Sequence, residues 1–171
     1  QIHNLKSMEE VRDIRKPGGV LDIVKKAKEE GIAKHIGFTG HTSAEAMTEA
    51  ANTFGVDTML IALNHHQKNK QAFEQGAVPA AKKNGLGVLG MKVVRPRESI
   101  EGLSAKDLIK YALSLDELDA IVIGIDSLEI LKTNIKLLKD FLPLPEEKMN
   151  KLRMSLKPYY DHHQLEWMHP D

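Results

Sequence analysis

Two patterns of hydrophobic and polar positions alternate along the chain. In residues 18–31, 42–55, 104–115 and 126–142, apolar residues recur every three or four positions, a spacing typical of amphipathic helices. Residues 58–64, 86–94 and 119–124 are short apolar runs, typical of strands buried in a parallel sheet. Shorter runs at 1–4 and 34–40 add two strands, and further helices are expected at 77–85 and 146–156. About five strands alternating with helices are predicted.

Turn and capping residues set the predicted ends of these elements. Gly31 can adopt the left-handed conformation that terminates a helix. Thr42 with Glu45, and Ser104 with Asp107, have the spacing of a capping box at a helix start. Each helix therefore has its own local start or stop signal.

Strand–helix alternation with short turns predicts right-handed crossovers and a parallel sheet. Two architectures remain open: an open doubly wound sheet, or an arc of a (β/α)8 barrel. No G-x-G-x-x-G turn follows a predicted strand, which weakens the doubly wound, dinucleotide-binding alternative. A whole barrel needs about 250 residues, so on the barrel alternative this chain of 171 residues would be about the second, C-terminal half of a TIM barrel. We expect this half-barrel at 1–142, and a C-terminal helix and aromatic tail packed on it at 143–171.

Composition narrows the function classes. Lys and Arg (24) balance Asp and Glu (24), so bulk charge favours neither nucleic acid nor an anionic membrane as a partner. The absence of cysteine excludes disulfides and thiolate metal sites. No apolar run approaches the ~20 residues of a membrane span, and no signal peptide opens the chain. We expect a soluble, cytoplasmic protein. The chain begins within a predicted strand and without Met, so we expect a fragment that lacks the earlier strands.

Polar and small residues follow most of the predicted strands. They are His3, Thr39, Gly40, His41, Asn64, His65, His66, Met91, Lys92, Gly124, Asp126 and Ser127. In a barrel these strand ends share one face, where active sites are built. The predicted site therefore lies at the carboxyl ends of the strands.

Five segments together resemble the aldo/keto reductase family. They are "QIHNL", "GIAKHIGFTGH", "ALN", "GVLGMK" and "IVIGIDSLEILKTN", which follow the order of strands four to eight and cover roughly residues 1–141. The "GMK" variant and the tail "YYDHHQLEWMHP" are closer to a bacterial subgroup of predicted oxidoreductases. The resemblance implies NAD(P)H-dependent reduction of a small-molecule carbonyl.

The resemblance implies one catalytic residue in this chain. His3 matches the histidine that orients the carbonyl, for which a neutral imidazole offers an N–H donor. The family's proton-donating tyrosine, with its lysine and aspartate, belongs to strands one to three, which this sequence does not contain. Tyr111, Tyr159 and Tyr160 are not candidates by position. Activity of this chain alone is therefore in doubt.

The resemblance also implies a set of cofactor contacts near the nicotinamide. Asn64 would pair with the nicotinamide amide, and Thr39 and Gly40 would supply a hydroxyl and close backbone approach to the same ring. Met91 stands where many relatives carry a stacking aromatic, and Lys92 would reach a phosphate. Each of these residues could equally be an ordinary turn or strand-end residue without a role in cofactor binding.

The adenosine half would lie at the last strand and the helix after it. Gly124 and Ser127 match the family's spacing at the helix start, where backbone N–H groups bind anions, and Asn134 would meet the adenine. Asp126 stands where relatives that prefer NADP carry a cation; its carboxylate repels a 2′-phosphate and favours NAD(H) over NADP(H). Asp126 could instead cap the helix together with Glu129.

The remaining histidines, the aromatic tail and the sheet edges bear on other functions. The histidines give no metal-ligand spacing, so no metal site is predicted. Tyr159, Tyr160, Trp167 and Met168 could wall a substrate pocket or cover an apolar surface. The rival function is a non-catalytic half-barrel that binds nucleotide or only assembles. A half-barrel has two unpaired sheet edges, so we expect a homo-oligomer or edge pairing.

Overall fold

The computed structural model describes residues 1–63, 72–94 and 102–162, with only the backbone for 158–162. In these ranges the strands are β1 (Ile2–Leu5), β2 (Gly37–Gly40), β3 (Thr58–Ala62), β4 (Gly87–Met91) and β5 (Ala120–Ile121). The helices are α1 (Met8–Ile14), α2 (Val20–Glu29), α3 (Ala44–Thr53), α4 (Ala77–Lys83), α5 (Ala105–Leu113), α6 (Leu128–Lys139) and α7 (Glu146–His162). The predicted alternation of strands and helices is confirmed.

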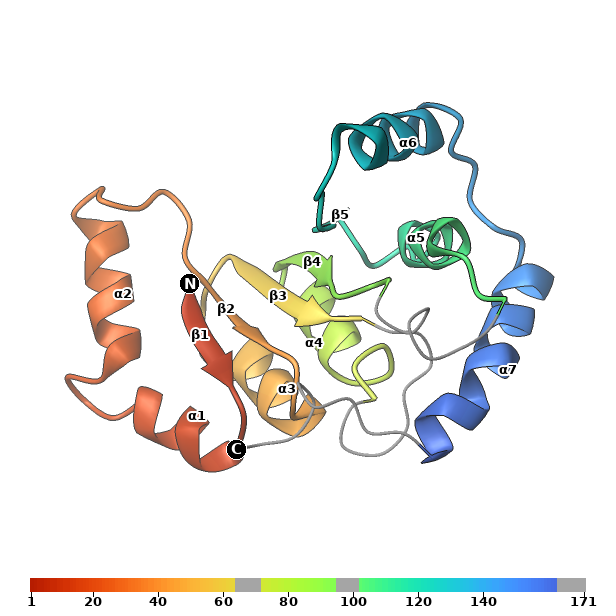
Figure 1. Cartoon of the computed structure of the whole chain (residues 1–171). Coiled ribbons are helices and arrows are strands. Elements are labelled where there is room, and N and C mark those ends of the chain that lie inside the picture. The colour runs from red at the N-terminus through yellow and green to blue at the C-terminus, as the bar shows by residue number, and fades with distance from the viewer. Residues whose placement is uncertain (64–71, 95–101, 163–171) are drawn as a thin grey trace.

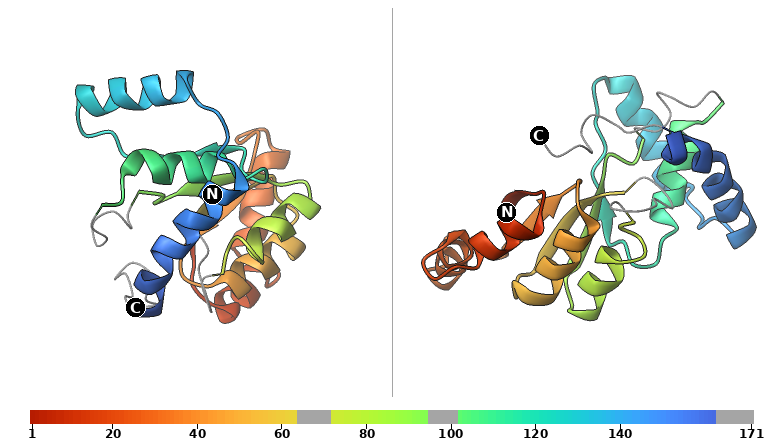
Figure 2. Two further views of the ribbon diagram at one scale, coloured as in Figure 1. Left: turned by 90° about the vertical axis from the view of Figure 1, so that its right-hand side faces the viewer. Right: turned by 90° about the horizontal axis from the view of Figure 1, so that it is seen from below.

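All strands pair in parallel, in the order β1-β2-β3-β4-β5 (Figure 1). When right-handed crossovers always advance in one direction along the sheet, every intervening helix lies on the same side of it. A doubly wound sheet, in contrast, needs a reversal of the strand order. Accordingly, α3 and α4 lie on one face of the sheet (Figure 2). The strand order decides the fold class: an α/β sheet of the kind found in part of a (β/α)8 barrel.

The two faces of the sheet differ in burial. Phe38, Met59 and Val88 form one row across three strands, and all three are fully buried. Their neighbours Leu60 and Leu89 point to the opposite face and are only half-buried. The sequence shows continuous apolar runs, but the structure covers one face with helices and leaves the other partly open.

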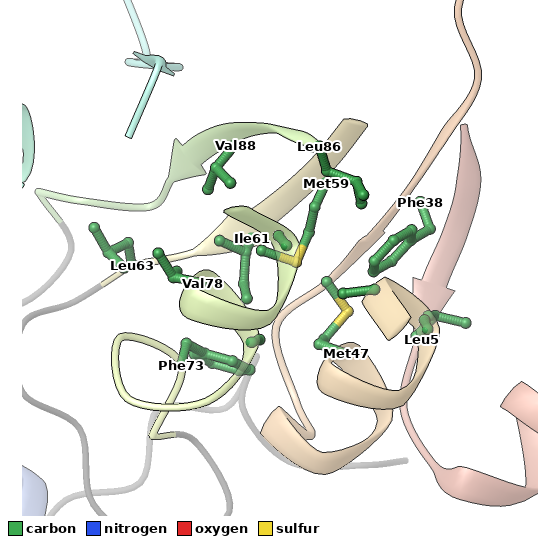
Figure 3. Close-up of a cluster of buried hydrophobic side chains, with 14 of the residues drawn as sticks. Leu5, Phe38, Met47, Met59, Ile61, Leu63, Phe73, Val78, Leu86 and Val88 are labelled. Carbon is green, nitrogen blue, oxygen red and sulfur yellow. The ribbon is translucent and has the colours of Figure 1, made fainter. Parts of the chain in front are cut away.

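The core fills the space between the sheet and the helices α3 and α4. Met47 on α3 points toward Phe38 and Leu5, while Val78 on α4 lies near Ile61 (Figure 3). The ring of Phe38 meets that of Phe54 edge-on, with centroids 5.6 Å apart and planes at 71°, a preferred aromatic geometry. This contact joins the sheet to the end of α3.

Two similar clamps fasten the amino ends of the strands. Asp57, just before β3, accepts hydrogen bonds from Lys28 Nζ (2.6 Å) and from the Ile36 N–H (2.9 Å). Asp119, just before β5, accepts them from Lys82 Nζ (3.0 Å) and the Val88 N–H (2.7 Å). The hydrogen bond from Lys28 and that from the Ile36 amide lower the pKa of Asp57. The Val88 amide and Lys82 do the same to the pKa of Asp119.

Several local predictions are confirmed and others need correction. Gly31 has the expected positive φ of 73°, and Ser104 Oγ accepts from the Asp107 N–H. The cap of α3, however, is Ser43, whose Oγ accepts from the Ala46 N–H at 3.1 Å, so the capping box at Thr42 was wrong by one residue. Helix α1 was not predicted.

The C-terminal part is organised differently from its sequence pattern. β5 has only two residues, although 119–124 reads as a longer strand. The apolar stripe of α6 is largely exposed, since Leu128, Ile135 and Leu138 are 66%, 44% and 49% accessible. Helix α7 packs against α5, and the Leu144 N–H donates to Ser114 Oγ at 2.7 Å. The division at residue 142 stays a prediction.

Candidate functional site

The strand register gives a row of residues against which the predicted site residues can be placed. Leu5, Gly40, Ile61, Gly90 and Ile121 align in one row across the five strands. Residues beyond this row lie on the carboxyl side of the sheet, which is the side that carries active sites in barrels. Positions relative to this row show which predicted residues the fold brings to one rim.

On β2, Thr39 and Gly40 have different surroundings. Thr39 lies one residue before the row and is 4% exposed; it points away from the helix-covered side because its neighbour Phe38 faces that side. A Cβ on Gly40 would meet Met47 Sδ at 2.5 Å and the Leu5 carbonyl oxygen at 2.8 Å. Gly40 is therefore required by packing between β1 and α3, whatever it contributes to a ligand.

At the end of β4, Met91 lies one residue past the row and is half-buried. Lys92 follows with a φ of 61°. Among the described residues, it alone has a positive φ without being glycine. The left-handed conformation costs an L-residue about 1–2 kcal/mol, and such residues concentrate at functional sites.

On β1, the pairing with β2 is irregular. Ile2 pairs with Phe38 and Leu5 with Gly40, so β1 has one extra residue between the two pairs. His3 lies in this bulge with an exposed side chain. A bulge re-aims the side chains within it, and the adjacent Asn4 has a buried Oδ1 that accepts no hydrogen bond. The sequence pattern did not identify Asn4 as a candidate, although Asn4 directly follows His3.

Two of the residues predicted near β5 and α6 share one helix face. Ser127 is the N-cap of α6 and its Oγ accepts from the Ile130 N–H at 3.2 Å. Asn134 follows seven residues later, on the same face of the helix, and its Nδ2 is buried without a hydrogen-bond partner. Gly124 and Asp126 are exposed, and a Cβ on Gly124 would meet no atom within 4 Å. Ser127, and not Asp126, caps the helix.

Some predicted residues lie outside the described residues. They are Asn64, His65, His66, Trp167, Met168 and the side chains of Tyr159 and Tyr160. Asn64 follows directly after Leu63, the last described residue beyond β3. Its role stays a prediction.

The arrangement suits a ligand that extends across several strands. Adjacent strands lie about 4.8 Å apart, so Thr39 on β2 and Met91 on β4 are separated by the width of β3. His3 lies on β1 at one edge of the sheet, and Ser127 begins the helix that follows β5 at the other edge. A compact ligand could not touch both ends, whereas an elongated one could follow the rim.

A nicotinamide dinucleotide is such a ligand, and the chemistry of the rim can be tested against it. The group needs donors for its adenine and pyrophosphate, and α6 provides an enclosed, unpartnered amide donor at Asn134 and a capped N-terminus at Ser127. Lys92 adds a cation at the end of β4. The residues present fit the group.

Comparisons with known proteins support the fold. No protein-family model matches the chain, and no curated protein matches it in sequence. Among solved structures it resembles the aldo-keto reductase AKR11C1 from Bacillus halodurans in its holo form, with a TM-score of 0.62 and 13% identity. No described helix is long and apolar enough to cross a membrane. The likeness covers 81% of this chain and 55% of that structure, so the chain has the fold of about half of an aldo-keto reductase barrel.

Proposed function

We propose that the chain is the C-terminal half of an aldo/keto-reductase-type oxidoreductase, which binds a nicotinamide cofactor along the carboxyl rim and reduces a small carbonyl compound. The observation that carries this proposal is the pairing of Ser127 and Asn134 on one face of α6, with the buried Asn134 Nδ2 unpartnered. An unsatisfied buried donor costs about 1–3 kcal/mol. A ligand acceptor at this position would remove that cost.

The cofactor would lie with its adenosine half on α6. Free N–H groups and the dipole of the first turn of α6 favour the pyrophosphate, and Asn134 would donate to an adenine nitrogen. Asp126 is exposed directly before Ser127, so its carboxylate can accept from a ribose diol and repels a 2′-phosphate. We therefore infer a preference for NAD(H).

The nicotinamide half would lie over β2 to β4. Thr39 would present its hydroxyl on the face of β2 opposite to Phe38. Met91 would pack its thioether against the ring, and Lys92 would reach a phosphate. Asn64 would complete this half.

In the reaction the cofactor supplies the hydride. His3 would hold the carbonyl oxygen by donating a hydrogen bond from its ring, from the bulge that exposes its side chain. Tyr111 does not provide the proton, because its hydroxyl donates to Glu74 and lies fully buried on α5. The proton donor would come from residues that precede this sequence in the whole enzyme.

Cofactor titration tests the proposal. NADH fluorescence should change on binding to the chain, and Asn134→Leu, which removes the donor at similar size, should weaken binding at least tenfold. Thr133→Val on the exposed side of α6 is the matched control and should bind as the wild type does. Asp126→Ser should narrow the difference in binding affinity between NADH and NADPH. Equal binding by the Asn134 and Thr133 variants would contradict the proposal.

A second candidate function is a non-catalytic module that binds nucleotide or assembles with other chains. The exposed apolar side chains of α6 favour it, together with β1 and β5, each of which pairs with one strand only in the described sheet. On this alternative the chain would form a homo-oligomer through its edges. Light scattering of the chain, followed by addition of NADH and a reactive aldehyde, separates the candidates: oligomers that bind NADH without loss of absorbance at 340 nm support the module.

A further inference from the structure

A second polar cluster lies among α5, α7 and the segment before α4. Tyr111 on α5 donates from its hydroxyl to Glu74 Oε2 at 2.9 Å. Arg153 on α7 donates from Nε to the same hydroxyl oxygen at 2.9 Å, and its guanidinium carbon lies 5.5 Å from the centroid of the Tyr111 ring. The cluster ties three separate parts of the chain together and contains none of the residues placed at the carboxyl rim.

A cavity of about 350 Å³ opens beside this cluster. Glu74, Glu117 and Arg153 line it together with Asn150, and Val78 and Leu115 provide an apolar part of its wall. The volume is sufficient for a small organic molecule of several heavy atoms. Its lining therefore combines charged groups with a short apolar surface.

Glu74, which lines this cavity, carries an unsatisfied acceptor. Its Oε1 is enclosed and accepts no hydrogen bond, although Oε2 is satisfied by Tyr111. Burial raises the pKa of Glu74 to about 7, and the charge of Glu117 adds to this, while the Tyr111 hydroxyl and Arg153 act in the opposite direction. A donor that also carries positive charge would satisfy the oxygen and oppose the burial effect.

Arg153 does not meet this need. Its Nη1 donates to Glu146 Oε1 at 2.6 Å and to Asn150 Oδ1 at 3.0 Å, and its Nε donates to Tyr111. With the charge of Arg153 paired to Glu146, the carboxylates of Glu74 and Glu117 remain on the cavity wall. The local charge therefore favours a cation.

The chemistry of the wall restricts the kind of cation. Among the described residues no three His, Cys, Asp or Glu side chains gather in a way that could hold a metal ion. Val78 and Leu115 suit an alkyl group instead. We propose that this cavity binds a small primary alkylammonium ion, whose N–H donates to Glu74 Oε1, whose charge is balanced by Glu117, and whose alkyl part packs on Val78 and Leu115.

Calorimetric titration of the full chain with n-butylammonium chloride at pH 8 tests this site. One binding event per chain is expected, and Glu74→Gln should weaken it at least tenfold because the anionic acceptor is lost. Glu29→Gln on the exposed side of α2 is the matched control and should bind as the wild type does. Tetramethylammonium, which has the charge but no N–H donor, should bind at least tenfold more weakly.

A second variant covers the case in which Glu74→Gln does not fold. Glu117 is exposed, so Glu117→Lys should fold and place the chain's own ammonium group at the cavity, which would abolish n-butylammonium binding. The proposal is overturned if the wild type does not bind n-butylammonium, if Glu117→Lys binds it as the wild type does, or if tetramethylammonium binds equally well.

Discussion

Helices α3 and α6 begin in the same way and end in different environments. Each follows a strand and is capped by a serine whose Oγ accepts from the N–H three residues on, Ser43 at 3.1 Å and Ser127 at 3.2 Å. Yet α3 buries five residues against the sheet and its neighbours α1 and α4, whereas the buried residue of α6 is Leu137. Capping and periodicity specify that a helix forms, but the elements around it decide what the helix buries.

The two helices should differ most in how much free energy of unfolding is lost when an apolar side chain is shortened to alanine. Met47→Ala on α3 should lower the free energy of unfolding by about 2–5 kcal/mol, because a fully buried side chain leaves a cavity. Leu128→Ala on α6 should change it by less than about 0.5 kcal/mol, since Leu128 is largely exposed. Urea unfolding measures both, and similar losses would show that α6 is packed in solution.

A second comparison concerns carboxylates with opposite pKa changes. The pKa of Glu74 rises from about 4.5 to about 7, so the folded state holds its proton more tightly and stability falls as pH rises through this range. We expect a loss of about 1–3 kcal/mol between pH 5 and pH 8.5. Glu74→Gln should remove that slope in urea unfolding at several pH values.

The clamp aspartates should behave in the opposite sense. The pKa of Asp57 lies below its ordinary value of 3.8, so its contribution is present above about pH 4 and is lost as pH falls through the folded value. Its partly exposed pair with Lys28 limits the effect to about 0.5–1 kcal/mol. Asp57→Asn should reduce the acid loss of stability while leaving the slope above pH 5 unchanged; a change in that upper slope would contradict the assignment to Glu74.

Removal of the two serine caps should affect the two helices differently. Ser43→Ala should cost about 1 kcal/mol in global unfolding because α3 is part of the core. Ser127→Ala should leave global unfolding nearly unchanged and instead speed amide hydrogen exchange in the first turns of α6. If Ser127→Ala lowered the urea midpoint as much as Ser43→Ala does, α6 would belong to the same cooperative unit.

Much of the fold could be predicted from local pattern. Apolar runs gave the strands, and their spacing with helices predicted parallel pairing. Helix α1 could also have been found, because Ser7 and Glu10 have the spacing of a capping box and Ser7 Oγ accepts from the Glu10 N–H. The length of β5 could not be predicted, because a strand ends where its partner stops offering hydrogen bonds, and that depends on β4.

In the candidate site, too, local features could be predicted and features that depend on tertiary contacts could not. The sequence placed Ser127 at the start of α6 and polar residues near the rim, since these follow from strand ends and capping. It did not indicate the packing role of Gly40, which arises from Met47 and the Leu5 carbonyl across two other elements. The enclosed oxygens of Asn4 and Glu74 were also missed, because enclosure is a property of tertiary contacts.

The two aspartate clamps have a consequence for how this architecture is extended. In each, a lysine near the end of one helix and the start of the following strand are joined to the carboxylate that precedes the next strand, as in Lys28–Asp57 and Lys82–Asp119. Each helix–strand–helix stretch is therefore held together by hydrogen bonds at the amino end of its own strand. A further stretch of this kind could extend the sheet without changing the contacts of the earlier ones.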